Sequence, residues 1–103
     1  MNLQITGNKN LIISPSVKIL VEDKISGKLN KLVTKLEPLT ADVIIDKDKF
    51  DNFIVSFDLL LGKDKIYAKT SHPKLESALV DISEDAERQI KRHKADQVNY
   101  SLG

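Results

Sequence analysis

The segment from residue 53 to residue 61 constrains the fold more than any other part of the sequence. Large apolar side chains recur at every second position, and outward positions between them include Ser56 and Asp58. A period of two residues predicts a β-strand with one buried face. The side chains on that face are Phe53, Val55, Phe57, Leu59 and Leu61. A chain of 103 residues must therefore supply a second layer to cover them.

Three further strands are predicted around this one. Leu3 and Ile5 alternate with polar residues at the start of the chain, residues 42–46 form a short apolar run, and residues 66–70 alternate again. Residues 47–51 form a charged turn, and residues 62–64 form a hairpin connection. Because the connections between the last three strands are short, we expect those strands to pair antiparallel.

Two amphipathic helices are predicted. The first begins at Ser14-Pro15, where a capping side chain precedes a proline, and runs to about Leu36 before Glu37-Pro38. Ser26-Gly27 interrupts it, and we expect a kink or bulge there because an interior glycine costs about 1 kcal/mol. The second helix starts near Ser71-His72-Pro73 and runs to about Lys94 or slightly beyond. Its apolar positions, at steps of three and four, are Leu75, Ala78, Leu79, Ile82, Ala86, Ile90 and His93.

The expected order is thus β-α-β-β-β-α. It predicts an α+β two-layer sandwich, with a mainly antiparallel four-stranded sheet and two helices on one face. Residues 1–96 form the single domain, and residues 97–103 form a short flexible tail. The chain has no cysteine, no apolar run long enough for a membrane span and no secretory signal, so we expect a cytoplasmic protein.

Catalytic chemistry has little support in the sequence. His72 is interpreted as a helix-start residue, and His93 as a satisfied residue at the core edge or one that faces phosphate. Ser56 and Asp58 are interpreted as sheet-surface residues. The acidic residues do not have the spacing of a calcium loop, and the sequence lacks a zinc motif, a phosphate loop and a nucleophile elbow. We therefore expect a protein that is not an enzyme and needs no metal or cofactor.

Basic residues on the helices carry the functional argument, in a chain whose net charge is only +1. In the first helix, steps of four, three and four should place four lysines along one ridge that faces away from the sheet: Lys24, Lys28, Lys31 and Lys35. Few acids are nearby in the sequence, so these lysines are expected to be unpaired. The second helix ends in a basic run that contains Arg88, Lys91, Arg92 and Lys94. Glu84 and Asp85 can pair with Arg88, and Glu87 can pair with Lys91.

This charge pattern predicts binding to a polyanion such as a folded RNA, through backbone phosphates rather than base sequence. Lys65 and Lys69 flank Tyr67 on the outward face of the last strand, where Tyr67 is either a stacking platform for a base or a plain sheet-surface residue. Three alternatives stay open at this point. The lysines could simply form solvated helix faces without a ligand, the domain could bind structured RNA in general, or the helices could bind an acidic protein.

Several segments resemble the bacterial ribosome hibernation-promoting factors, also called ribosome-associated inhibitors or sigma modulation proteins. Residues 1–7 (MNLQITG) are similar to the start of that family, and residues 13–17 (ISPSV) to its helix entry. Residues 28–32 (KLNKL) and residues 87–94 (ERQIKRHK) resemble its two helical basic segments. The order and spacing of these pieces match over roughly residues 1–96.

The resemblance implies a fold like that of double-stranded RNA-binding domains and a site in the decoding channel of the small ribosomal subunit. Members of the family bind there, on the 70S ribosome, where messenger and transfer RNA would lie, and silence translation in idle cells. By position, the residues implied to contact 16S-type ribosomal RNA phosphates are Lys24, Lys28, Lys31, Arg88, Lys91, Arg92 and Lys94. The chain resembles a short single-domain form, for which the partner is a separate small ribosome-dimerising factor.

Three departures from the family pattern stand out. Asn8 and Gly27 resemble one-residue insertions, the second within the first helix. Residues 71–76 (SHPKLE) replace an acidic-Met-Tyr segment before the second helix. The sequence given ends at Gly103, with neither the additional C-terminal dimerisation domain of long members nor an extended acidic tail, so we expect a short form that acts as a monomer.

Overall fold

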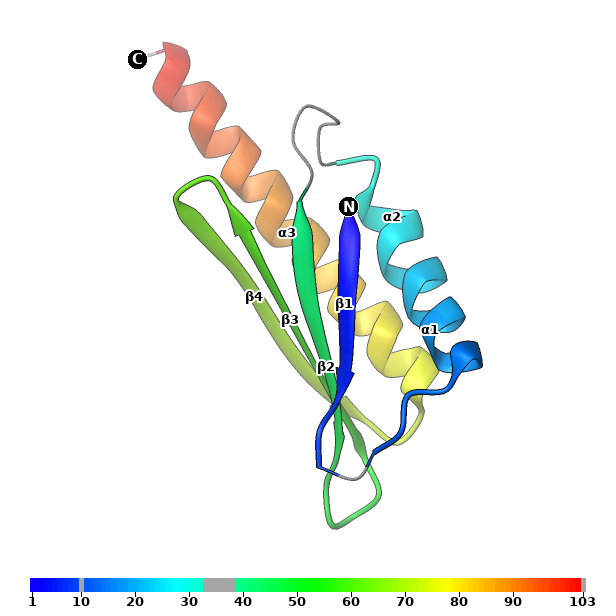
Figure 1. Ribbon diagram of the computed structural model, residues 1–103. Helices are drawn as coiled ribbons and strands as arrows, with labels where there is room; N and C mark the ends of the chain where they lie inside the picture. Colours follow the sequence, from blue (N-terminus) through cyan, green and yellow to red (C-terminus); the bar gives the residue numbers. More distant parts are fainter. Residues whose placement is uncertain (10, 33–38, 103) are drawn as a thin grey trace.

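Four strands form one mixed sheet in the order β1-β2-β3-β4 (Figure 1). The strands are β1 (Asn2–Gly7), β2 (Thr40–Lys47), β3 (Phe53–Leu61) and β4 (Asp64–His72). The computed structural model describes the backbone of residues 1–9, 11–32 and 39–102, and within these ranges the side chains up to residue 93. The β2–β3 and β3–β4 pairs are antiparallel, as predicted, whereas β1 pairs parallel with β2.

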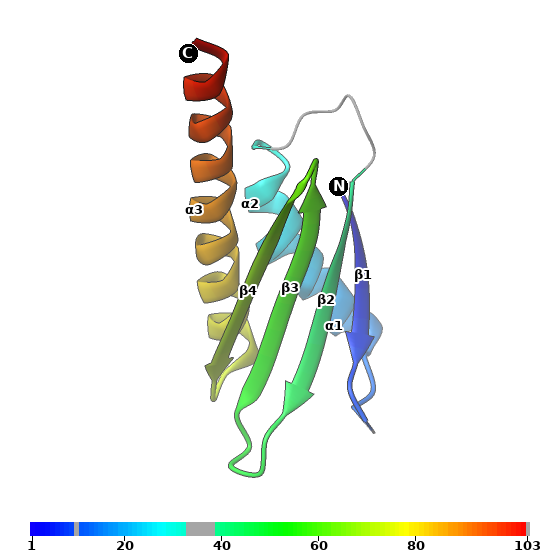
Figure 2. The ribbon, with the colours of Figure 1, turned by 90° about the vertical axis from the view of Figure 1, so that its left-hand side faces the viewer.

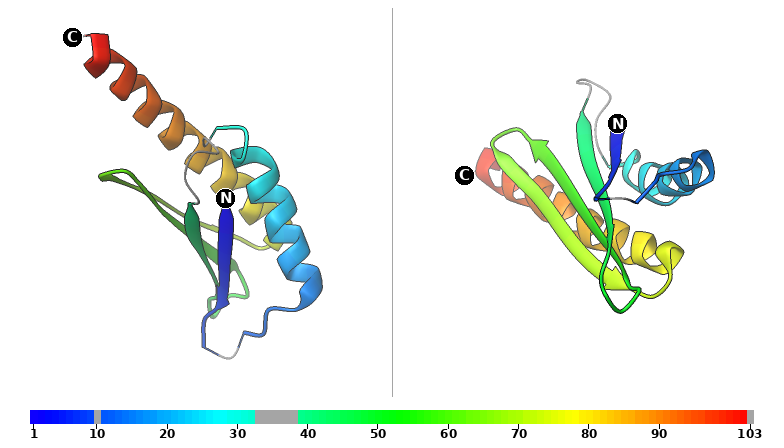
Figure 3. Two further views of the ribbon diagram at one scale, coloured as in Figure 1. Left: turned by 45° about the horizontal axis from the view of Figure 1, so that its top comes forward. Right: turned by 60° about the horizontal axis from the view of Figure 1, so that its bottom comes forward.

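The helices cover one face of the sheet, which confirms the two-layer α+β sandwich (Figures 2 and 3). The first helical segment consists of α1 (Pro15–Val21), η1 (Glu22–Ser26) and α2 (Gly27–Leu29). The second is α3 (Leu75–Leu102), which packs against β3 and β4. The β-α-β-β-β-α order is therefore confirmed. The molecule is elongated, with extents of 49 × 24 × 19 Å.

The core lies between these two layers, and its largest fully buried side chain is Phe57. Every second residue of β3 faces the helices, as the alternation predicts. The other buried apolar residues come from both helical segments and from strands β2 to β4: Val21, Ile25, Leu29, Ala41, Val43, Ile45, Val55, Leu59, Ile66, Ala68, Ala78, Leu79, Ile82, Ala86 and Ile90.

The first helix begins as predicted and then changes its winding. Ser14 Oγ accepts a hydrogen bond from the Val17 amide at 3.3 Å, and Pro15 occupies the first turn. The expected bulge at Ser26-Gly27 is confirmed as the π-helical turn η1, which ends at Ser26. A π turn holds one more residue than an α turn, so it takes up an extra residue without ending the helix. Its wide winding keeps Val21, Ile25 and Leu29, four residues apart, in the core.

Both predicted helix ends were wrong. The first helix ends at Leu29, and the chain turns through Asn30 and Lys31, where the Leu32 amide bonds to the Leu29 carbonyl at 2.9 Å. Residues 33–36, where the helix was expected to end, lie outside the described residues. α3 continues to Leu102, beyond the expected end near Lys94. The residues from 97 to 102 are thus helical, and their assignment to a flexible tail stays a prediction.

The β2–β3 turn is held by Asp48, as expected for a charged turn. One Asp48 oxygen accepts from the Phe50 and Asn52 amides at 2.9 Å each, and the other accepts from the Asn52 side chain at 3.2 Å. These bonds, that from the Asn52 amide first, lower the pKa of Asp48. The backbone bond from Lys47 and the Asn8 side chain likewise lower the pKa of Asp46. Both carboxylates therefore stay ionised to a lower pH than a free aspartate does.

Candidate nucleic-acid interface

Lys24 and Lys28 do not form an unpaired ridge that faces away from the sheet. They lie half-buried between the two helical segments, each with its ammonium group directed at a carboxylate of α3. Lys24 Nζ is 3.5 Å from Glu76 Oε1, and Lys28 Nζ is 3.9 Å from Glu84 Oε1. The prediction of unpaired lysines was wrong because these acids are distant in sequence and reach the lysines only through the fold.

The remaining two lysines of the predicted ridge are placed differently. Lys31 is exposed, but it lies in the turn after α2 rather than on the helix. Lys35 lies outside the described residues. The π turn between Lys24 and Lys28 also changes the spacing that a regular α-helix would give. A single continuous ridge of four lysines is therefore wrong for this chain.

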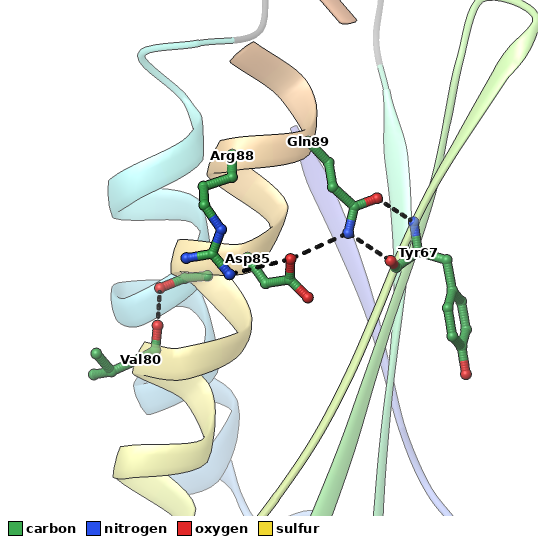
Figure 4. A network of polar contacts seen from close by, with 6 residues as sticks. Tyr67, Val80, Asp85, Arg88 and Gln89 are labelled. Atoms are coloured by element: carbon green, nitrogen blue, oxygen red, sulfur yellow. Dashed lines mark hydrogen bonds and ion pairs between the residues drawn. The ribbon is translucent and has the colours of Figure 1, made fainter. Parts of the chain in front are cut away.

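Three basic residues near the middle of α3, Arg88, Lys91 and Arg92, have exposed side chains. Arg88 is bonded to Asp85 at 3.3 Å (Figure 4). Lys91 Nζ is 4.0 Å from a Glu87 oxygen. Both pairs were predicted from the i+3 and i+4 spacing, although Glu84 pairs with Lys28 instead of Arg88. Arg92 is exposed. Lys94 lies on the α3 backbone, and its side chain is outside the described part of the chain.

A hydrogen-bonded link between α3 and β4 was missed by the sequence reasoning. The Gln89 side chain donates to the Tyr67 carbonyl at 2.7 Å and accepts from the Tyr67 amide at 3.3 Å (Figure 4). It thus satisfies backbone groups on the exposed edge of β4, where unpaired groups would otherwise attract another strand. The Tyr67 ring points away from α3 in the same view. No local pattern in the sequence signals such a bond.

The outward face of β4 carries Lys65, Tyr67 and Lys69, as predicted. This face of the sheet is opposite to the one that the helices cover, so Tyr67 and Lys69 are separated from the helical lysines. Tyr67 is 49% exposed, and Lys65 Nζ is 3.1 Å from Asp58. Asp58 therefore acts as a surface ion-pair partner, in agreement with its interpretation as a sheet-surface residue.

A shallow open cleft of about 290 Å³ lies where the β3–β4 hairpin meets α3. Lys65 and Arg92 line it together with Gln89 and His93. His93 Nδ1 is 2.6 Å from Asp64 Oδ2, and the His93 side chain is 9% exposed. This confirms His93 as a satisfied residue at the core edge. The cleft thus brings together two of the predicted RNA-binding residues, Lys65 of β4 and Arg92 of α3.

The described residues form neither a metal site nor a membrane-spanning helix. His72 ends β4, and its Nδ1 accepts from the Lys74 amide at 3.2 Å, consistent with a role before the helix. Among the described side chains, those of residues 1–9, 11–32 and 39–93, no three of His, Asp and Glu form a cluster that could hold a metal. In the same ranges, no helix has the length and apolar character needed to cross a membrane.

Most of the described cations in the candidate interface already have an acidic neighbour. Lys24, Lys28, Arg88 and Lys91 each lie within 4.0 Å of a carboxylate, and all these side chains reach solvent. Exposed pairs of this kind contribute about 0–1 kcal/mol each. A phosphate group can consequently displace a carboxylate at small cost to the fold.

Comparisons with known proteins agree with this fold. A ribosomal subunit interface protein from Coxiella burnetii superposes with a TM-score of 0.74 at 23% identity, over 92% of this chain and 99% of that one. The N-terminal domain of Protein Y from Thermus thermophilus gives 0.75 at 19% identity, over 90% and 99%. A search of curated proteins gave no significant match.

A family model described as "Sigma 54 modulation protein / S30EA ribosomal protein" matches residues 3–97. The match spans every strand and nearly all of the helical segments, and it confirms the resemblance that the sequence segments indicate. The chain therefore belongs to the family of sigma 54 modulation proteins and S30EA ribosomal proteins.

Proposed function

We propose that the protein is a ribosome-binding hibernation factor without enzymatic activity. It occupies the decoding channel of the small subunit, holds ribosomal RNA phosphates with its basic side chains, and excludes messenger and transfer RNA. Translation in idle cells is thereby inhibited. Its partners are 16S-type ribosomal RNA in the 70S ribosome and a separate small dimerising factor, and it acts as a cytoplasmic monomer.

Family membership over residues 3–97 carries this proposal. The relative from Coxiella burnetii is described as a ribosomal subunit interface protein, which supports a site between the subunits. The placement of the cations supports contact with RNA phosphates. Arg88, Lys91 and Arg92 reach solvent on α3, and Lys24 and Lys28 lie on the neighbouring helical segment. Phosphate contacts of this kind fix position without reading base sequence.

The dimensions of the molecule also suit a nucleic-acid path. α3 contains 28 residues, so at about 1.5 Å per residue it is roughly 42 Å long. The molecule measures 49 Å along its longest axis and 24 Å or less across it. A long, narrow domain with cations along its helical layer can lie lengthwise in a channel that otherwise holds RNA.

Co-sedimentation with vacant 70S ribosomes tests the proposal. We expect the protein to pellet with ribosomes, and binding to fall steeply as salt rises, because phosphate contacts release counterions. A Lys91→Glu/Arg92→Glu variant should lose binding and keep its melting temperature. Lys9→Glu/Lys49→Glu, at two exposed lysines in the loops that follow β1 and β2, is the control with the same change in net charge. An equal loss of ribosome binding in the test and control variants would contradict the proposal that α3 contacts ribosomal RNA.

Competition with initiator transfer RNA tests the location. If the protein fills the decoding channel, each ligand must weaken the other by the same factor. Pre-bound messenger and transfer RNA should exclude the protein, and added protein should inhibit initiation. Footprints that show this protein and P-site transfer RNA on the same small subunit would exclude the proposed location while leaving ribosome binding intact.

A further inference from the structure

Two acidic side chains of α3 lie where the proposed RNA site needs positive charge. Glu76 and Glu84 approach Lys24 and Lys28 across the space between the helical segments, at 3.5 and 3.9 Å. Their side chains are 65% and 49% exposed, so an approaching polyanion meets the carboxylates as well as the ammonium groups. The acids must either be displaced or remain beside the phosphates.

The stability of the fold does not explain why these acids are there. Pairs this exposed contribute little to folding, because both ions keep much of their hydration and salt screens them. Val21, Ile25 and Leu29 already attach the first helical segment to the core through full burial. An uncharged side chain at either acidic position would leave that packing intact. The acids therefore matter more for what the site binds than for how the helices dock.

We propose that Glu76 and Glu84 determine the specificity of the RNA site. They neutralise the ammonium groups of Lys24 and Lys28 in the free protein, and they repel an approaching polyanion. A rigid RNA surface that contacts the other cations of the domain at the same time offsets the displacement of these weak pairs. A flexible single strand makes fewer such contacts and still meets two carboxylates. This inference rests on the proposed function for its biological target.

Repulsion of the wrong partner is a general route to specificity. The low net charge of the chain, +1, agrees with it, because a protein with a bare cationic site would bind any nucleic acid in the cell. A lysine that is already neutralised by a carboxylate also releases no counterion when phosphate arrives. The acids should therefore reduce the salt dependence of non-specific binding as well as its strength.

The size of the effect follows from counterion release. Freeing one lysine for a single strand adds about 0.7 to the slope of log affinity against log salt concentration. Two freed lysines add about 1.4 to this slope. Over the tenfold range from about 1 M salt, where the counterion effect vanishes, to 0.1 M salt, that slope corresponds to roughly a 25-fold increase in affinity. That is the gain we expect for a flexible strand when both acids are neutralised.

The test compares Glu76→Gln/Glu84→Gln with Asp42→Asn/Asp81→Asn. The control makes the same change in net charge at two exposed acids that form no ion pair within the described part of the chain, Asp42 on β2 and Asp81 on α3. Two affinities are measured for each variant over a range of salt: for a fluorescent oligouridine, by polarisation, and for vacant 70S ribosomes, by sedimentation. Thermal melting confirms that each variant is folded.

The Gln variant should bind oligouridine roughly 10- to 30-fold more tightly at 0.1 M salt, with the steeper salt slope. Its ribosome affinity should rise by less, so that the preference for ribosomes over the loose strand falls. An equal gain in the control would show that net charge alone is responsible and would overturn the inference, as would unchanged oligouridine binding. If the wild-type protein fails to bind ribosomes, the proposed function fails, while the oligouridine measurement still decides whether the acids screen the lysines.

Discussion

Replacing Gly27 with alanine should stabilise the protein, although Gly27 directly follows a π-helical turn. Its backbone lies in the right-handed helical region at φ −57° and ψ −35°. A Cβ atom built there meets no atom within 4 Å, and the residue is exposed. Alanine therefore brings no clash, and it lowers the backbone entropy of the unfolded chain. The expected gain in the free energy of unfolding is about 0.5–1 kcal/mol.

For a domain of this size, each kcal/mol shifts the melting temperature by about 4–8 °C, so Gly27→Ala should raise it by roughly 2–8 °C. Gly62→Ala is the matched control. A Cβ at Gly62 also meets no atom within 4 Å, but φ is +65° at this first residue of the two-residue β3–β4 turn. That conformation costs a residue with a side chain roughly 1–2 kcal/mol, so the control should melt at a lower temperature. Because both sites have room for a Cβ atom, the difference in stability between the two variants reports the effect of the backbone angle φ, which is negative at Gly27 and positive at Gly62.

Urea unfolding followed by far-ultraviolet circular dichroism measures both variants, with the slope against urea expected to stay constant. A drop in stability for Gly27→Ala would refute the reasoning. It would mean that the π turn needs the freedom of glycine beside it, and that the open space around Gly27 closes in solution. An increase in both variants would show that the backbone conformation at Gly62 is not the constraint described here.

Three further outcomes follow from the packing, the helix cap and the acidic turn. Phe57→Ala should lower the free energy of unfolding by about 3–5 kcal/mol because the ring is fully buried, whereas Arg92→Ala should change melting little; equal losses would make Arg92 structural. Ser14→Ala should cost about 1 kcal/mol through loss of the helix cap, and a neutral result would show that Pro15 alone sets the helix start. The pKa of Asp48 is lower in the folded than in the unfolded protein, so ionised Asp48 adds to the free energy of unfolding. That contribution is complete above the ordinary carboxyl range and is lost as pH falls through the folded pKa. Asp48→Asn should therefore make stability depend less on pH in the acid range, as measured by melting between neutral pH and pH about 2.

Elements that depend on local patterns could be predicted from the sequence. The bounds of β3 match the prediction, and the capped start of the first helix and the antiparallel pairing of the last three strands are also confirmed. The end of the first helix could not be found in this way. Leu29 and Leu32 have helical spacing, yet the structure turns after Leu29 and still packs Leu32 against the core. Periodicity records which side chains are apolar, and a turn can present them to the core as well as a helix can.

The candidate site was predictable only where partners are close in sequence. Arg88–Asp85 and Lys91–Glu87 follow from helical spacing and are present. The pairs Lys24–Glu76 and Lys28–Glu84 join helical segments that are distant in the chain, so they require the packed structure. The same holds for the Gln89 bonds to the β4 edge. Long-range partners changed the interpretation of the first helix more than any local feature did.

The parallel position of β1 has a consequence for the order in which the molecule is made. Asn2 to Gly7 pair with Thr40 to Ile45, so the first strand to leave a ribosome during synthesis has no partner until some forty residues have followed it. β2, β3 and β4 are joined by short turns, and they can pair as soon as each is complete. The connection between β1 and β2 is also far longer than the two hairpin turns, so closing it costs more chain entropy. We therefore expect the strand that is synthesised first to be the last to become fixed in the sheet, as an edge strand that pairs once β2, β3 and β4 are in place.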